Sequence, residues 1–172
     1  MSLRPRSTPF AVNTDSRLLH RFYLALLGAP PDSYLLPSLV WQCVTHKSYS
    51  HGSLPYNDKL AFLGAALLPV LSLTQGRRTI KFVSLSKTLQ TAGLESVENP
   101  VTAKTSSDAI HNFALQHNVS AIMRWKPAFA DLHKSAKAQV ASECVEAIIG
   151  GIALSKGAAK AQSFCLERIL PS

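Results

Sequence analysis

The sequence predicts a single all-α domain, and three observations support this prediction. Apolar residues recur at the three- and four-residue spacing of helices along most of the chain. Strand-like alternation of apolar and polar residues is scarce. The 172 residues, 47% of them hydrophobic, suit one domain with a sizeable core and are too apolar for a disordered chain.

Local start and stop signals predict where the helices lie. Asp15 or Ser16 can cap a first helix, which Gly28 and the prolines after it end. The segment from Asp58 is apolar on almost all sides, so it belongs at the centre of a core or an interface, and Gly76 is expected to break it. The other expected elements are a helix at 37–48, a loop at 48–57, a short amphipathic piece at 85–94, a linker at 95–105, a helix capped by Ser106 or Ser107, a long helix at 134–154 and a last helix that Gly157 starts and that runs to residue 170.

The charge of the chain is lopsided. There are 18 Lys and Arg residues against 10 Asp and Glu, a net charge of +8. Such a surplus on a small domain indicates a polyanionic partner, either nucleic acid or an anionic membrane, and the alternative is a merely soluble basic protein. The longest apolar stretch, 61–73, is too short to span a bilayer and is interrupted by Pro69, so no membrane span is expected.

The first residues differ in composition from the rest. Residues 1–15 are expected to form a basic extension ahead of a domain over 16–172. Arg4, Arg6 and Arg17 stand among Ser and Thr with a single acid, as at the start of a mitochondrial presequence or in the remnant of one. This composition favours the mitochondrial matrix as the address.

The metal-binding residue types show no ligand pattern. The cysteines are odd in number and widely separated, without a CxxC, so reduced core cysteines are expected rather than disulfides or zinc. His46 is expected to be a hydrogen-bonded structural residue, and the other histidines lack metal-ligand spacing. No cofactor or metal is therefore expected. The cysteines are Cys43, Cys144 and Cys165.

Three segments carry a family resemblance. The first segment begins with THKSY at Thr45 and continues, after a loop, with NDKLAFLGAALL from Asn57. The second, residues 107–124, reads SDAIHNFALQHNVSAIMR. The third, ECVEAIIGG, begins at Glu143. In order and spacing these resemble the ribonuclease III family, whose endonuclease domain has THxS(Y/F), then NERLEFLGDAVL, then DxxEAxxGA. The resemblance covers about residues 16–170 and implies the helical endonuclease fold of that family.

The resemblance also implies a broken catalytic site. Phosphodiester hydrolysis by metal ions needs several carboxylates that converge on divalent cations. Ala61 and Ala65 stand where the family has the glutamate and aspartate of LEFLGD, and methyl groups cannot bind a metal. The second pair of acids survives as Glu143 and Glu146, and Asp58 remains one turn away. No catalytic residues are expected, and the alternative for the two glutamates is that they are ordinary solvated or ion-paired acids, with weak metal binding still open.

Phe62 stands at the aromatic position of the signature, which in the family lies at a symmetric dimer interface. The resemblance therefore implies an interface formed by Phe62, Leu63 and Leu67, with a second copy or another ribonuclease III-like chain. A simple core phenylalanine is the alternative.

The best candidates for RNA phosphate contacts are Arg4, Arg6, Arg77, Arg78 and Lys81, although a scattered basic surface is nearly as good an interpretation of each. No double-stranded-RNA-binding domain is expected before the end at Ser172. A minimal domain of this kind with a presequence-like start resembles the ribonuclease III-like proteins of the fungal mitochondrial large ribosomal subunit. That resemblance implies ribosomal RNA and other ribosomal proteins as partners.

Three functions remain open on the sequence. The first is a structural protein of the mitochondrial large ribosomal subunit. The second is an RNA-processing nuclease that acts on double-stranded RNA with Asp58, Glu143 and Glu146. The third is a non-ribosomal adaptor that dimerises with an active homologue.

Overall fold

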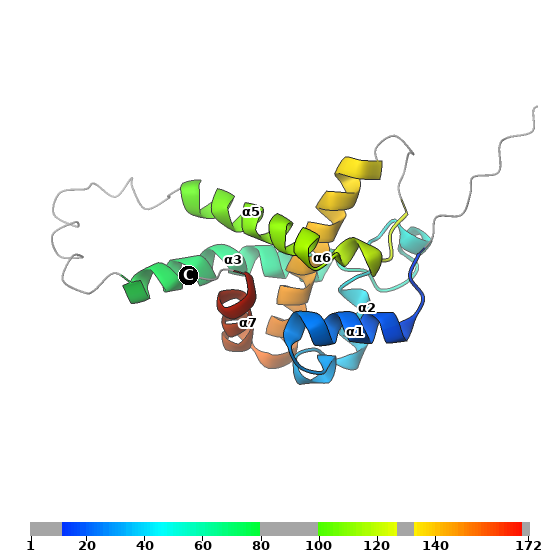
Figure 1. Ribbon diagram of the computed structural model, residues 1–172, viewed down its shortest axis with the longest axis horizontal. Helices are drawn as coiled ribbons and strands as arrows, with labels where there is room; N and C mark the ends of the chain where they lie inside the picture. Colours follow the sequence, from blue (N-terminus) through cyan, green and yellow to red (C-terminus); the bar gives the residue numbers. More distant parts are fainter. Residues whose placement is uncertain (1–11, 80–99, 127–132, 170–172) are drawn as a thin grey trace, which may run out of the picture.

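The computed structural model describes residues 12–79, 100–126 and 133–169, and these ranges contain helices and loops but no strand. The predicted all-α class is confirmed. Figure 1 shows α6 in the middle of the molecule, α3 and α5 extending to one side of it, and α1 with α2 at the other. The helices are α1 (Ser16–Leu27), α2 (Pro37–Gln42), α3 (Asp58–Thr79), α5 (Pro100–Gln116), α6 (His133–Lys156) and α7 (Ala158–Phe164), with short 3-10 turns η1 (Pro31–Ser33), η2 (Tyr49–Gly52) and η4 (Val119–Ala121) and a final π-helical turn η5 (Cys165–Ile169).

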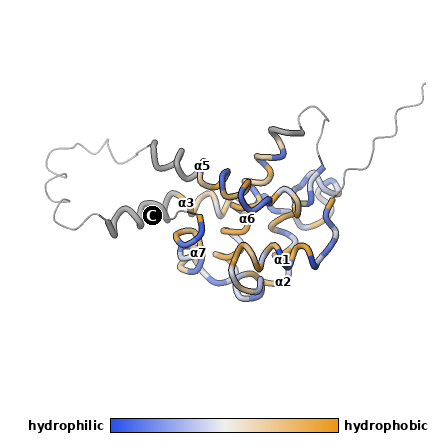
Figure 2. The backbone as a smooth tube through the Cα atoms, in the orientation of Figure 1, coloured by the Kyte–Doolittle hydropathy of each residue, from blue (hydrophilic) through white to orange (hydrophobic). Residues whose placement is uncertain are grey.

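The core is built around α6, which packs against α3, α5 and α7. Figure 2 shows hydrophobic residues gathered along the helices where they meet and hydrophilic residues at the loops. The long helix predicted at 134–154 is confirmed by α6, and the apolar residues of its middle turns are buried. Cys144, Ala147, Ile148, Ile149 and Ile152 have 0% exposure.

Both ends of α1 lie where the sequence predicts them. The Asp15 carboxylate accepts a hydrogen bond from the backbone N–H of Arg17 at 2.8 Å, which satisfies one of the free donors of the first turn. At the other end Gly28 has φ 70°, and its N–H donates to the Leu24 carbonyl at 3.0 Å. A left-handed residue of this kind ends a helix, and glycine adopts it without steric cost.

The helix predicted over 37–48 is shorter than expected, because α2 ends at Gln42. The Arg124 N–H donates to the Val44 carbonyl at 2.7 Å, and the His46 N–H donates to the Arg124 carbonyl at 2.9 Å. These bonds form a parallel bridge between Thr45 and Arg124, which holds this part of the chain out of the helix. The expected loop at 48–57 contains the turn η2.

Two predicted boundaries around the third helix are wrong. Gly76 does not break α3, which continues to Thr79, since glycine costs only about 1 kcal/mol in a helix interior. The linker predicted at 95–105 is helical from Pro100, a residue well suited to the first turn, so Ser106 and Ser107 lie inside α5. The expected piece at 85–94 lies outside the described residues.

The last helix is confirmed from Ala158 and continues as η5 to Ile169, with Gly157 at its N-cap position. The expected free cysteines are all buried. Burial raises the pKa of Cys43 to about 12, so this side chain stays a thiol.

One helix is more apolar than we expected. Ala136–Lys156, within α6, is long and apolar enough to cross a membrane by length and composition, with a mean hydropathy of 1.2. Of its most apolar stretch, 56% is buried inside the structure, and the helix forms the centre of the core. Burial among other helices explains its apolar composition.

Candidate functional site

The site is organised by the crossing of α3 and α6, which are in backbone contact. A Cβ atom added to Gly64 would overlap the carbonyl oxygen of Glu146, and one added to Gly150 would overlap the carbonyl oxygen of Leu60. Only glycine allows two helices to approach this closely. The crossing therefore fixes the turn of α3 around Gly64 against the turn of α6 that carries Glu146.

Ala61 and Ala65 lie one turn apart on α3, on either side of Gly64 in sequence. Ala61 is buried, whereas Ala65 is exposed. The surviving acids, Glu143 and Glu146, lie on neighbouring turns of α6, and both are partly exposed. The crossing places Gly64, which lies between Ala61 and Ala65 in sequence, against the backbone of Glu146.

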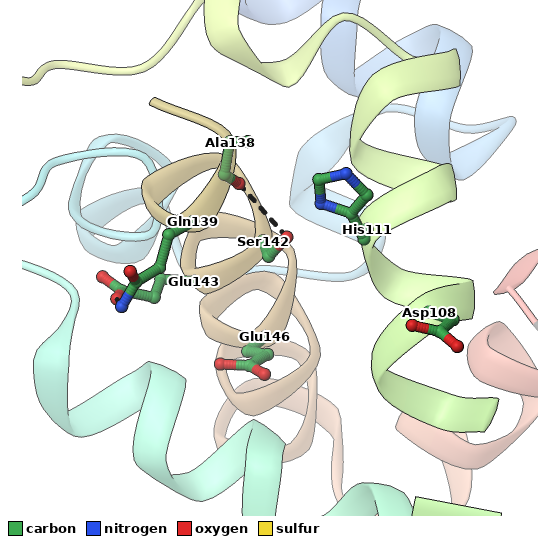
Figure 3. A pocket seen from close by; sticks show the side chains of 7 residues that line it. All are labelled: Asp108, His111, Ala138, Gln139, Ser142, Glu143 and Glu146. Atoms are coloured by element: carbon green, nitrogen blue, oxygen red, sulfur yellow. Dashed lines mark hydrogen bonds between the residues drawn. The ribbon is translucent and has the colours of Figure 1, made fainter. Parts of the chain in front are cut away.

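Both glutamates line a cavity of about 530 Å³ between α5 and α6. Figure 3 shows Asp108 and His111 on α5 across from Ser142 and Glu146 on α6. The Ser142 hydroxyl donates to the carbonyl of Ala138 at 3.2 Å, so it is engaged within its own helix. Among the side chains that the structure describes, the cavity is lined by three carboxylates and by no Lys or Arg.

Charge repulsion and burial act on the inner carboxylate. Burial, and after it the Glu143 carboxylate, raise the pKa of Glu146 above its ordinary value of 4.5. Glu143 has polar neighbours instead. The Gln139 amide donates to its Oε1 at 3.2 Å, and the His46 Nε2 lies 3.7 Å from its Oε2.

His46 is held by its own loop, as expected for a structural residue. Its Nδ1 accepts from the backbone N–H of Ser48 at 3.2 Å, which leaves the hydrogen of the neutral ring on Nε2, facing Glu143. Burial lowers the pKa of His46, while Glu143 partly opposes this effect. The contact is therefore mainly that of a neutral imidazole with a carboxylate.

Asp58, the remaining acid of the signature, faces another partner. Its Oδ2 lies 3.2 Å from the Nζ of Lys47, and it does not line the cavity of Glu143 and Glu146. Among the described residues no group of three or more His, Cys, Asp or Glu side chains has the geometry to hold a metal ion.

A second cavity of about 660 Å³ lies on the other side of Glu143. It is bounded by the loop around His46, by Trp125 and Lys126, and by the N-terminal part of α6. Sequence reasoning missed this cavity and the residues Asp108 and His111. Those two lie three residues apart and so share a helix face, a spacing that could have drawn attention to them.

The predicted interface residues lie on the outer side of α3. Phe62 is 78% exposed, which excludes the core alternative within this chain, and Leu63 and Leu67 are half-buried.

The side chains of the predicted phosphate contacts all lie outside the part of the chain whose side chains are described. Arg4, Arg6 and Lys81 lie outside the described residues, and Arg77 and Arg78 lie in the last turns of α3, where only the backbone is described.

The chain is similar to known proteins over most of its length. The family model described as Ribonuclease-III-like matches residues 37–172. The large ribosomal subunit protein mL57 of Neurospora crassa is 33% identical over 185 residues, which cover 96% of this chain; the chain spans 66% of that relative's length.

Solved structures agree on the fold. Two structures of the nuclease domain of ribonuclease III from Campylobacter jejuni match with 22% identity, one at a TM-score of 0.59 over 88% of this chain and 95% of that domain, the other at 0.57 over 91% and 95%. The predicted family and fold are therefore confirmed, and the chain belongs to the ribonuclease-III-like family.

Proposed function

We propose that this chain is a structural constituent of the mitochondrial large ribosomal subunit, built on a catalytically inactive ribonuclease III fold. The similarity to a large ribosomal subunit protein of Neurospora crassa supports the ribosomal role. The presequence-like composition of the first residues supports the mitochondrial matrix as its location.

The observation that carries the proposal is the close crossing of α3 and α6, which places the turn with Gly64 against the turn with Glu146. The backbone carbonyl of Glu146 lies against Gly64, and Gly64 lies between Ala61 and Ala65 in the sequence of α3. Of the ligand set that the family resemblance implies, only Glu143 and Glu146 remain. Asp108 lines the same cavity, but no three acids among the described residues have the geometry to hold a metal ion, which supports an incomplete set of oxygen ligands for metal-assisted hydrolysis. In this chain the site is proposed to be a remnant.

The ribosomal role is tested by sedimentation. Tagged protein in an organelle lysate at moderate salt should travel with the large ribosomal subunit. Recovery only in an RNA-free soluble fraction would contradict the proposal, and recovery with an active ribonuclease III homologue would favour an adaptor instead.

The loss of activity has its own test. The purified chain should leave double-stranded RNA intact in Mg²⁺ or Mn²⁺. Metal-dependent cutting that is abolished by Glu146→Gln would establish an enzyme. The ion pair of Asp58 with Lys47 argues against recruitment of that acid as a replacement ligand.

Ribosomal RNA and a protein are the proposed partners. The net charge of +8 supports RNA binding, with Arg4, Arg6, Arg77, Arg78 and Lys81 as proposed phosphate contacts. The exposure of Phe62 supports pairing through Phe62, Leu63 and Leu67 with a second ribonuclease III-like chain or another copy, beside other ribosomal proteins.

A further inference from the structure

The second cavity has no role in the proposed function. Its volume of about 660 Å³ lies within the range of small-ligand sites. It shares Gln139 and Glu143 with the acidic cavity, so the two recesses lie side by side along α6. They differ in charge, because the second has Lys47 and Lys126 at its rim.

The walls of this cavity are held in place by hydrogen bonds between the loop around His46 and the segment with Lys126. The Ser48 hydroxyl oxygen accepts from the backbone N–H of Lys126 at 3.0 Å, and it lies 2.9 Å from the Nδ1 of His46. The parallel bridge between Thr45 and Arg124 lies directly before these residues in both segments. The cavity is therefore preformed by two segments that are tied to each other.

The loop at the mouth has an unusual backbone. Ser50 and His51 have φ 51°, and Gly52 has φ 74°. Consecutive left-handed residues other than glycine are costly, and such strain concentrates where a side chain must be presented in one direction. Here the turn carries His51, an exposed residue that lines the cavity.

The lining combines an apolar inner part with polar and cationic groups. Trp125 and Val140 line the apolar inner part, where 8% of Trp125 and 5% of Val140 are exposed. Gln139 provides an amide oxygen on α6, since its nitrogen donates to Glu143, and His46 provides the edge of an imidazole whose nitrogens face Ser48 and Glu143. Aromatic and apolar contact for a base, with donors and acceptors for its edge, is how proteins bind unpaired nucleotides of RNA.

The two lysines can meet the phosphates of such a nucleotide. Lys126 is exposed. Lys47 is 61% exposed and pairs with Asp58 at 3.2 Å, a surface ion pair of the weak kind that a phosphate can replace. On the far side Glu143 and the acidic cavity repel phosphate, so the strand is confined to the side of the lysines.

We infer that this cavity, between the 46–51 loop, Trp125–Lys126 and the start of α6, binds an unpaired nucleotide of an RNA strand, with its phosphates on Lys47 and Lys126. The inference rests on the proposed RNA-binding function and adds a site on the described part of the chain. It concerns single-stranded nucleotides, whereas a fully paired helix offers no base to enter the cavity.

The first test uses the fluorescence of Trp125 in the full chain. Trp41→Phe leaves Trp125 as the single tryptophan and keeps an aromatic ring beneath the Arg124 guanidinium, which lies 3.4 Å from the Trp41 ring centroid. A labelled hairpin RNA with an adenosine loop should quench Trp125, and a duplex with the same number of phosphates should not. Equal quenching by both RNAs, or none, would overturn the inference.

The second test removes the cations one at a time. Lys126→Gln and Lys47→Gln should each weaken hairpin binding several-fold and lower the salt dependence of log K by about 0.7. The matched control is Lys156→Gln, an exposed lysine at the other end of α6, which should have a clearly smaller effect. Equal effects of Lys126→Gln and Lys156→Gln would show a diffuse basic surface and would overturn the inference.

Two further arms separate this site from its alternatives. Glu143→Gln should tighten hairpin binding by removing a repelling charge, whereas weaker binding would indicate a metal-bridged contact. Polyglutamate should not quench Trp125; if it does so as well as RNA, the cavity binds acidic protein segments. If the chain sediments with ribosomes but the hairpin RNA does not quench Trp125, only this inference fails. If the chain neither sediments with ribosomes nor binds RNA, the proposed function fails too.

Discussion

The two halves of α6 serve different purposes. From Ala147 to Ile152 the helix is buried and glycine-packed against α3, while from Ala136 to Glu146 it presents polar side chains to two cavities. The first half also has buried core residues, among them Val140, Cys144 and Val145, so it combines a packed face with a face that lines the cavities. Side chains that face the cavities can therefore change while the buried residues of the same helix still hold the fold together.

The strongest way to break the packed half is to push α3 and α6 apart. Gly150→Ala would add a methyl group onto the Leu60 carbonyl, where backbone on both sides leaves nothing to move aside. We expect a loss of about 4–5 kcal/mol or more in the free energy of unfolding, or no folded protein. Urea titration followed by circular dichroism measures it. Gly157→Ala is the control, since open space surrounds that glycine and only its φ of 88° opposes the change; equal losses would contradict the close crossing.

The buried half can also be tested by removing volume. Ile149→Ala should cost about 3 kcal/mol, because the side chain is 0% exposed and its loss leaves a cavity. Leu154→Ala, one turn further along α6 at 61% exposure, should change stability by less than about 0.5 kcal/mol. Thermal unfolding of both variants would show whether burial changes so sharply along one helix.

The same division explains what the sequence could predict. The ends of α1 depend on Asp15 and Gly28, which act on their own neighbours, so sequence signals located them. The end of α2 depends on Arg124, which is far along the chain and reaches residues 44–46 only after folding. No local pattern carries that information.

The site divides in the same way. Glu143 and Glu146 could be singled out because they share a short motif, and the family resemblance implied their relation to Ala61 and Ala65. Asp108 faces them from another helix, and the tight crossing at Gly64 and Gly150 is a tertiary contact. Such features arise from helix packing, which the spacing of residues along one helix does not encode.

The polar half should respond to pH where the packed half does not. Burial and Glu143 raise the pKa of Glu146, so the folded state binds this proton more tightly than the unfolded state. Ionisation of Glu146 therefore lowers stability as pH rises from 4.5 through the raised pKa, and the full penalty is present above it. Glu146→Gln should unfold at a higher temperature than the natural chain at pH 7, and the difference should vanish near pH 4.

Calorimetry at the two pH values measures this difference. The exposed Glu167→Gln is the matched control, which should behave alike at both. A Glu146→Gln variant that is less stable at pH 7 would mean that the carboxylate has a favourable partner in the cavity.

The smallest effect on stability is expected on the outer side of α3. Phe62→Ala removes a side chain that is 78% exposed, so the free energy of unfolding should change by less than about 0.5 kcal/mol. Binding should respond instead, since truncation of a large aromatic at an interface commonly costs far more than its neighbours do. Leu115→Ala, on α5 at 60% exposure, is the control for loss of an exposed apolar side chain. Analytical ultracentrifugation and co-purification should show that Phe62→Ala loses its protein partner while Leu115→Ala keeps it. Retention of the partner by both variants would place the contact surface elsewhere and leave the exposure of Phe62 without a role in pairing.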